Sequence, residues 1–233
     1  MKNIILFSLS ASLLLLAPSA HSVTVRGTGS AALVGGDLTD PDNNGLPDAN
    51  TNYNATFRSS HESFFGQLSD TVREGAFNVF DNRVGAGNDK WCCDGPTSNS
   101  PVWVEANLGA QYILTSFTIA SGNDTPARDA DQWQILGSND GINYNAIFNY
   151  NNDGVSPWTA RNQVLQYIAG TDFAQPTAYS IFRYQATSVI TGSQHQLNEL
   201  EFFGRKASVP EPSSLALLGL GMLGLRIARR AAA

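Results

Sequence analysis

The chain has 233 residues, a formal net charge of −6 and only 15% charged side chains. Residues 23–208, which lie between two apolar ends, carry ten Lys or Arg against nineteen Asp or Glu, a formal charge of −9. Nucleic acids and anionic lipids are bound by neutralising phosphates with basic side chains, so this acidic balance argues against both as partners. The length of this stretch suits one domain.

The first 22 residues form a predicted secretory signal peptide. Lys2 precedes the apolar run 4–16, and Ala20 and Ser22 stand at the −3 and −1 positions of a cut before Val23. The apolar run is shorter than the roughly 20 residues that a membrane-spanning helix needs. We therefore expect the mature chain to be exported.

Residues 23–52 form a polar segment that contains a candidate calcium loop. The stretch "DPDNNGLPD" places oxygen ligands at alternating positions and a glycine where such a loop turns sharply. The candidate ligands are Asp40, Asp42, Asn44 and Asp48. Because Thr51 stands where an EF-hand has a glutamate, the loop looks more like a single thrombospondin type 3 or dockerin loop. An Asx-rich turn without metal is the alternative.

The body of the chain is rich in short runs that are typical of β-strands, and it lacks a sustained apolar recurrence at helical spacing. Turn residues such as those of "GSNDG" separate the runs. The runs cover residues 101–108, 112–121, 132–138, 179–189 and 197–204. The pattern predicts an all-β antiparallel sandwich or barrel, with a jelly roll as our first choice. The expected core residues are Trp133, Ile135, Phe182, Leu200 and Phe202.

Cys92 and Cys93 are the two cysteines of the chain, and they are adjacent. An exported protein meets oxidising conditions, which favours a vicinal disulfide that would form a rigid, mildly apolar knob beside Trp91. Two reduced or buried thiols and intermolecular bridges are the alternatives. A closed zinc site needs four ligands, and outside the signal peptide only His61 and His195 could join the cysteines.

The C-terminus combines Pro210, Glu211 and Pro212 with a short apolar run over residues 215–225 and a basic tail. The run is too short for a settled membrane span, although a weak C-terminal anchor is an alternative. The three parts, in this order, closely resemble the PEP-CTERM sorting signal of Gram-negative exopolysaccharide producers. The resemblance assigns residues 205–233 to sorting. It implies processing by an exosortase-type enzyme, transient membrane contact, and delivery to the cell surface or extracellular matrix.

Residues 53–204 are similar to discoidin-like domains, also called coagulation-factor C-type or galactose-binding-like domains. The resemblance is carried by "AFNVFDN", "VWVEANLG", Arg128 with Asp129, "QILGSNDG" and the closing "ELEFFG". It implies a jelly-roll sandwich of about eight antiparallel strands. It also implies a non-catalytic function in which loops at one end bind ligands, usually glycans.

The candidate sugar-binding residues lie in the polar loops between the expected strands. Trp158, in "DGVSPWTARN", is either an exposed platform for a sugar ring or tucked against the sandwich. Its candidate polar partners are Asn123, Asp124, Arg128 and Arg161. Arg128 has a second interpretation, because an arginine among Asp124, Asp129 and Asp131 can fork onto a carboxylate and fix a loop.

A second calcium position follows from the resemblance alone. Discoidin-like sugar-binding modules commonly hold a structural calcium between an early loop and a glutamate of the last strand, which correspond here to Asp81 and Glu199. The inserted stretch "VGAGN" alters the spacing of that loop. Glu199 could instead be the buried partner of Arg183 or Arg205.

Two functions remain open at this point. The first is a calcium-shaped carbohydrate-binding protein associated with exopolysaccharide at the cell surface, and the second is a matrix protein that binds other proteins or itself. A lectin should expose an aromatic residue beside amide or charged groups, whereas an adhesive surface should show an apolar patch of several hundred Å². The chain contains no G-x-S-x-G elbow, H-E-x-x-H motif or evident Cys-His pair, so we do not expect an enzyme.

Overall fold

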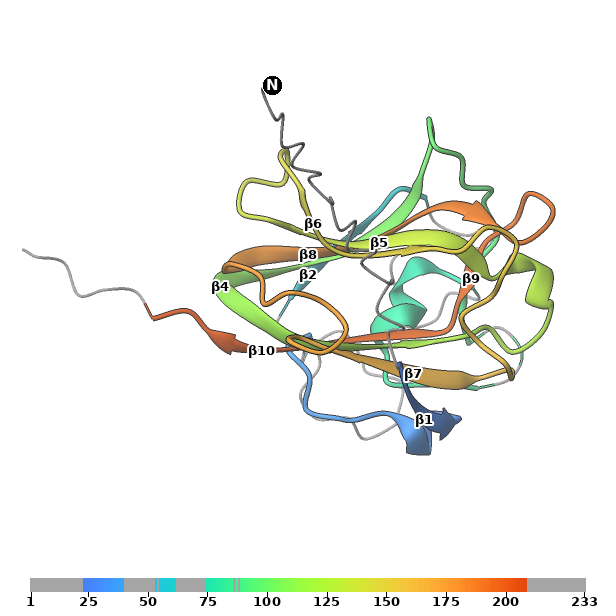
Figure 1. The fold of residues 1–233 in the computed structure, drawn as a ribbon, viewed down its shortest axis with the longest axis horizontal. Helices are drawn as coiled ribbons and strands as arrows, with labels where there is room; N and C mark the ends of the chain where they lie inside the picture. The colour runs from blue at the N-terminus through green and yellow to red at the C-terminus, as the bar shows by residue number, and fades with distance from the viewer. Residues whose placement is uncertain are drawn as a thin grey trace, which may run out of the picture.

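The computed structural model describes residues 23–39, 53, 55–61, 74–85, 87 and 89–208. These residues form two packed β-layers with short 3-10 helices between some of the strands (Figure 1). The strands are β1 (Thr24–Thr28), β2 (Thr56–Ser59), β3 (Trp91–Cys92), β4 (Val102–Ala120), β5 (Ala130–Ser138), β6 (Asn145–Asn151), β7 (Gln163–Ile168), β8 (Tyr179–Val189), β9 (Gln196–Leu197) and β10 (Glu199–Lys206). The 3-10 helices are η1 (Ser30–Ala32), η2 (Ala76–Phe80) and η3 (Pro126–Arg128).

Strand β4 belongs to both layers. Its first part, residues 102–107, pairs with β2 and β8, and β8 continues through β5 to β6. Its second part, residues 112–120, pairs with β10 and with β7, which leads to β1. Every ladder is antiparallel, as a jelly-roll sandwich requires. The predicted all-β jelly-roll fold is therefore confirmed.

The sequence predicts two separate strands where the structure has one bent strand. The register of β4 against β8 shifts between Asn107 and Tyr112, and Gly109 there has a φ of 65°. The Gly109 amide donates a hydrogen bond of 3.0 Å to the Asn107 side chain, which stabilises the local turn. Turn residues thus bend the strand from one layer into the other without ending it.

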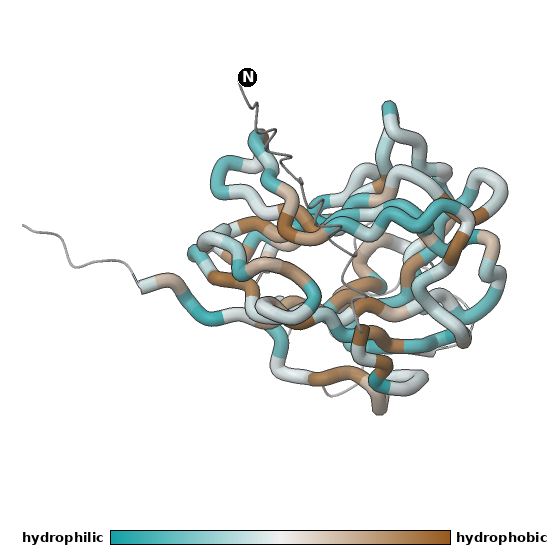
Figure 2. The backbone as a smooth tube through the Cα atoms, in the orientation of Figure 1, coloured by the Kyte–Doolittle hydropathy of each residue, from teal (hydrophilic) through white to brown (hydrophobic). Residues whose placement is uncertain are grey.

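The core fills the space between the layers with aromatic and aliphatic side chains. The five residues predicted for it, Trp133, Ile135, Phe182, Leu200 and Phe202, are all buried. Phe117 lies at the centre, stacked on Tyr167 with 4.9 Å between ring centroids and in edge contact with Phe148. Figure 2 shows hydrophobic and hydrophilic residues interchanging along the strands, which is the pattern that places alternate side chains between the layers.

The "GSNDG" turn is present, but it is wider than a two-residue hairpin. Strand β5 ends at Ser138 and β6 begins at Asn145. The Asp140 carboxylate accepts hydrogen bonds from the amides of Ile142 and Asn143 at 2.9 and 2.8 Å. These bonds, together with one from the Asn143 side chain, hold the pKa of Asp140 below its usual range. Its short polar side chain therefore fixes the turn.

Several predicted segments lie outside the described residues. They are the signal peptide, the calcium loop with Asp40, Asp42, Asn44 and Asp48, and the sorting motif with Pro210, Glu211 and Pro212. Within the part of the chain that the structure describes, no helix is long and apolar enough to cross a membrane.

Truncation of a central aromatic residue should be costly. Phe202 is fully buried and packs on Phe182 and Phe80, so Phe202→Ala should lower the free energy of unfolding by about 3–5 kcal/mol. Urea denaturation of both proteins measures this difference. Ile142→Ala is the matched control, because Ile142 is 81% exposed and its truncation should change stability by less than about 0.5 kcal/mol. Equal losses in both variants would refute the packing described above.

Candidate functional site

Four connections meet at one end of the sandwich, which we call the loop end. They join β3 to β4, β4 to β5, β6 to β7 and β8 to β9. Backbone hydrogen bonds link them: His195 donates to Asp94 at 2.8 Å, Thr191 to Ala127 at 3.0 Å, and Asn162 to Gly122 at 3.3 Å. In Figure 1 these connections lie on the side of β9, away from the tip of β10.

A buried lysine ties these connections together. The Lys90 side chain is only 1% exposed, and its ammonium group lies 2.8 Å from the Asp124 carboxylate and 2.8 Å from the Asn123 amide oxygen. The Gln196 amide oxygen is a third acceptor at 3.3 Å. Burial alone would raise the pKa of Asp124, but the hydrogen bond and charge of Lys90 outweigh it and lower that pKa. A buried cation with three acceptors is well satisfied, so this contact fixes the loops.

Asn123 and Asp124, predicted from the sequence as polar sugar contacts, both turn a side-chain oxygen towards Lys90. The Asp124 side chain remains 49% exposed, so part of its carboxylate still faces solvent at the loop end. Sequence reasoning missed Lys90 as the centre of this cluster. The sequence gives no signal for this role, because the acceptors of Lys90 lie more than 30 positions further along the chain.

Cys92 and Cys93 form a vicinal disulfide, which is the first of the three alternatives left open by the sequence. Cys92 is buried and Cys93 is half-buried. One guanidinium nitrogen of Arg128 lies 3.7 and 3.9 Å from the two sulfur atoms. Glu74 approaches the same sulfurs, but a metal would need thiolates, which a disulfide does not offer. The disulfide and Arg128 instead form a compact surface at the loop end.

The bidentate arginine of the site is Arg161, whereas the sequence pointed to Arg128. The two terminal nitrogens of Arg161 lie 2.7 and 2.6 Å from the two oxygens of the fully buried Asp129. Ser156 donates a further hydrogen bond of 2.7 Å to Asp129. This fork joins the β6–β7 connection to the β4–β5 connection, which gives Arg161 a structural role. Arg128 is directed to the disulfide because η3 places it over the sulfur atoms.

Trp158 is not an exposed platform. Its side chain is 4% exposed and belongs to the core, and the indole nitrogen donates to the Ile119 carbonyl at 3.4 Å. The structure therefore realises the alternative in which Trp158 is tucked against the sandwich. The polar sequence around Trp158 suggested an exposed sugar platform. In the structure the β6–β7 connection instead directs the indole ring into the core.

Asp81 and Glu199 are buried carboxylates that lie near one another, and both have raised pKa values. Burial and the neighbouring Asp81 charge raise the pKa of Glu199, while burial and Asp89 raise that of Asp81. Among the described residues, neither carboxylate oxygen of Glu199 has a hydrogen-bond partner. Arg183 does not pair with Glu199, since it bonds Glu105 at 2.8 Å. Asp81 accepts the Arg83 amide hydrogen at 3.0 Å, so the free oxygen atoms are those of Glu199. A buried carboxylate without a donor, next to a second carboxylate, fits a hard divalent cation such as calcium.

The fold and the connected loops define a galactose-binding-like β-sandwich. The chain belongs to the F5/8 type C domain family, whose model matches residues 57–199, more than half of the chain. A second model, the PEP-CTERM protein-sorting motif, matches residues 208–230 and indicates export and surface localisation. Both resemblances drawn from the sequence are thereby confirmed. A search of curated proteins finds no match.

Several solved structures share the architecture at low sequence identity. An f-lectin (fucolectin) from striped bass serum, Morone saxatilis, is 16% identical with a TM-score of 0.51, and the match covers 68% of this chain and 49% of the lectin. CpGH89CBM32-5 from Clostridium perfringens, in complex with GalNAc-β-1,3-galactose, is 18% identical with a TM-score of 0.46, covering 65% and 96%. A fucose-binding module of Streptococcus pneumoniae, SpX-3, is 13% identical with a TM-score of 0.47, covering 73% and 98%.

A buried histidine should make the loop end sensitive to acid. His195 is 1% exposed, its Nε2 lies 2.9 Å from the Tyr184 hydroxyl, and burial, with a smaller effect of His61, lowers its pKa from 6.5 to about 3. In the unfolded chain His195 therefore binds a proton as the pH falls through 6.5, whereas in the folded chain it stays neutral down to about pH 3. The contribution of His195 to stability is present above pH 6.5 and is lost as the pH falls, by up to about 1.4 kcal/mol per pH unit.

Urea denaturation at several pH values between 6.5 and 5, compared between the wild type and His195→Gln, measures this contribution. Gln can still bond the Tyr184 hydroxyl but does not titrate. We expect the stability advantage of the wild type over the variant to shrink as the pH falls. A constant difference across this range would contradict the buried neutral state of His195.

Proposed function

We propose that this protein is an exported, non-catalytic glycan-binding protein that acts at the cell surface or in the extracellular matrix of a Gram-negative bacterium. Its membership of the F5/8 type C domain family carries the proposal, and the similar fold of the striped bass fucolectin supports it. The sorting motif supports the part of the proposal that places the protein at the cell surface. Exopolysaccharide is the glycan that such a protein would meet there, and an exosortase-type enzyme would process the segment around Pro210, Glu211 and Pro212.

The loop end supplies the contact surface in this proposal. Arg128 and the disulfide of Cys92 and Cys93 form a rigid, partly apolar surface, and Asn123 and Asp124 place polar groups beside it. The buried Lys90 and the Arg161–Asp129 fork hold these groups in place before any ligand arrives. Preorganised polar groups bind a ligand without a further ordering cost, which is why a fixed loop end suits recognition.

The alternative of a protein-binding matrix domain has less support from the described surface. Its exposed large hydrophobic residues are Val25, Val34, Ile142, Val155 and Ile168. They lie on different strands and connections and are single residues that need no partner. An adhesive interface would instead gather such residues into one contiguous apolar patch of several hundred Å².

Glycan binding at the loop end is tested by a screen of the exported protein on an array of neutral and acidic glycans. We expect saturable binding of at least one glycan. The affinity should be at least about tenfold lower in Arg128→Ala, because a hydrogen bond from a charged donor is lost. Arg205→Ala is the matched control, since Arg205 is exposed near the end of β10 and should not affect binding. Absence of glycan binding, with capture of a matrix protein by the same surface, would replace this function with the adhesive one.

We further propose that Asp81 and Glu199 hold a structural calcium ion, and that the loop with Asp40, Asp42, Asn44 and Asp48 holds another. Calcium should raise the melting temperature of the wild type, because the cation offsets the repulsion between the two buried carboxylates. Glu199→Gln should lose a large part of this increase, and titration calorimetry should show one bound ion fewer. Asp153→Asn, at an exposed carboxylate, should behave as the wild type does. Identical calcium responses in all three proteins would refute the site at Glu199.

A further inference from the structure

A cleft opens along one side of the sandwich, next to the β6–β7 connection, and its lining includes neither Arg128 nor the two cysteines. It has a volume of about 820 Å³ and lies between β6 of one layer and the segment that follows β7 in the other. Val23 at the start of β1 also contributes to its wall. The volume lies within the range of about 300–1,000 Å³ that is usual for small-molecule sites. We call this feature the lateral cleft.

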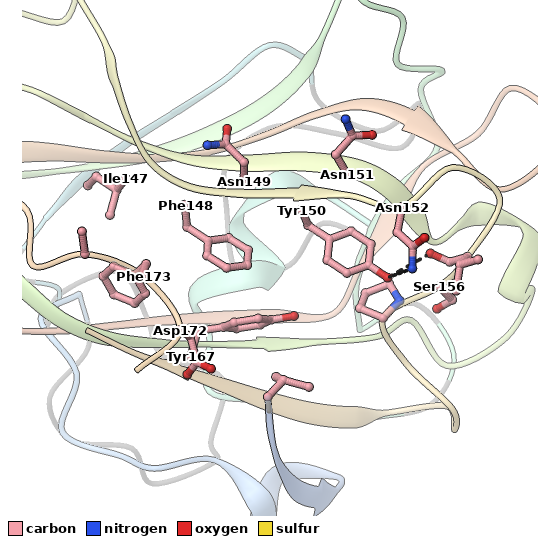
Figure 3. Close-up of a pocket in the computed structure, with 14 residues that line it drawn as sticks. Ile147, Phe148, Asn149, Tyr150, Asn151, Asn152, Ser156, Tyr167, Asp172 and Phe173 are labelled. Atoms are coloured by element: carbon pink, nitrogen blue, oxygen red, sulfur yellow. Dashed lines mark hydrogen bonds between the residues drawn. The ribbon is translucent and has the colours of Figure 1, made fainter. Parts of the chain in front are cut away.

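Aromatic rings form both walls of the lateral cleft. Figure 3 shows Phe148 and Tyr150 pointing from β6 into the cleft, opposite Tyr167 and Phe173. One face of Tyr150 is stacked on Trp133 at 5.7 Å between centroids, which fixes its orientation. Tyr167 is 3% exposed and lies between Phe117 at 4.9 Å and Phe148 at 4.6 Å, so it belongs to the packed floor of the cleft. The half-buried Tyr150 is therefore the rigid ring that can face a ligand, and the negative faces of aromatic rings attract cations.

The lateral cleft contains one buried carboxylate with a free oxygen. Asp172 is 3% exposed, and its Oδ2 accepts the Ile168 amide hydrogen at 2.7 Å. Its Oδ1 is buried with no hydrogen-bond partner among the described residues. A buried carboxylate oxygen without a donor is costly, so a ligand that brings a donor would be favoured.

No lysine, arginine or histidine is among the described residues that line the lateral cleft. Asp172 thus has no cationic side chain as partner there, and a positively charged donor would gain most from it. Ser156 and Asn152 offer further polar groups at one end of the cleft. Burial, together with Tyr150 and Asp172, raises the pKa of the Tyr167 hydroxyl, so this group stays protonated and can donate.

We propose that the lateral cleft binds a hexosamine unit that carries a free ammonium group. The ammonium group would bond Asp172 Oδ1, the sugar ring would lie against the Tyr150 ring, and the hydroxyl groups would reach Ser156 and Asn152. A simple amine would leave most of the cleft unfilled, and a neutral sugar would leave Asp172 without a charged partner. The inference rests on the proposed function for the ligand class, but it places a second glycan site beside the surface formed by Arg128 and the disulfide, on residues that this surface does not include.

The test uses the full-length chain labelled with ¹⁵N at tyrosine and cysteine. The chain has seven tyrosines and two cysteines, so the spectrum separates the two sites: Tyr150 and Tyr167 report on the lateral cleft, and Cys92 and Cys93 report on the loop end. The probes are glucosamine and glucose, which differ only by the amino group, and N-acetylglucosamine, in which that group is uncharged. Tyr112 and Tyr179, which do not line the cleft, are internal controls.

Glucosamine should shift the Tyr150 and Tyr167 signals with saturation, at least about tenfold more tightly than glucose or N-acetylglucosamine. Asp172→Asn should abolish this preference, because its amide can still accept the Ile168 hydrogen bond but carries no charge. Tyr167→Phe is a second variant, which keeps the ring and should weaken binding of all three sugars. An unchanged melting temperature in each variant verifies the fold.

Three outcomes would overturn the inference. They are equal affinities for the three sugars, an unchanged glucosamine preference in Asp172→Asn, and shifts confined to Cys92 and Cys93. The last outcome would leave the loop-end function intact, so failure of the inference is distinguishable from failure of the proposed function. Shifts at neither site would count against both.

Discussion

The buried ammonium group of Lys90 is the contact on which the loop end depends. An ammonium ion that loses its water must find acceptors within the protein, and Lys90 finds them in Asn123 and Asp124 of the β4–β5 connection and in Gln196 of β9. The loops can therefore adopt only arrangements that bring these oxygens to one point. The Arg161–Asp129 fork imposes the same kind of constraint on the β6–β7 connection. One buried and one partly buried cation thus fix a surface that is itself made of loops.

Strand β10 lies between the loop end and the sorting motif along the chain. The ladder of β10 with β4 begins with Glu199 opposite Ala120, beside the loop end, and runs to Lys206 opposite Tyr112. Figure 1 shows that β10 leaves the sandwich on the side away from β9. The sorting motif follows β10 in sequence. A chain held at the surface through that segment would present its loop end outwards, where a glycan can reach it.

Much of the fold could be predicted from the sequence, because alternation of apolar residues is a local signal. Trp133 and Ile135 alternate with polar neighbours and are buried, as expected. The continuity of β4 could not be predicted, since Gly109 marks a turn whether the strand ends there or bends. The sandwich needs the bent strand to connect its two layers, and that requirement is a property of the whole fold.

The site could be predicted less well, because its contacts are long-range. Arg128 has several carboxylates near it in sequence. The Asp129 carboxylate nevertheless pairs with Arg161, which lies 32 positions further along the chain. Trp158 stands in a polar loop and is nevertheless buried, since the loop folds over it. Lys90 carried no motif at all. Charge partners and burial at the loop end are decided by which loops meet, and local sequence holds little information about that.

Hydrogen–deuterium exchange of the full-length protein, with and without the exopolysaccharide of its own host, tests the central claim most directly. The account predicts slower exchange on binding in residues 89–97 and 121–129, because these segments carry the loop-end surface. Exchange elsewhere on the outer faces of the two layers should not change. Protection confined to those outer faces, or no protection at a concentration where the polysaccharide binds, would contradict the claim that the loop end recognises the glycan.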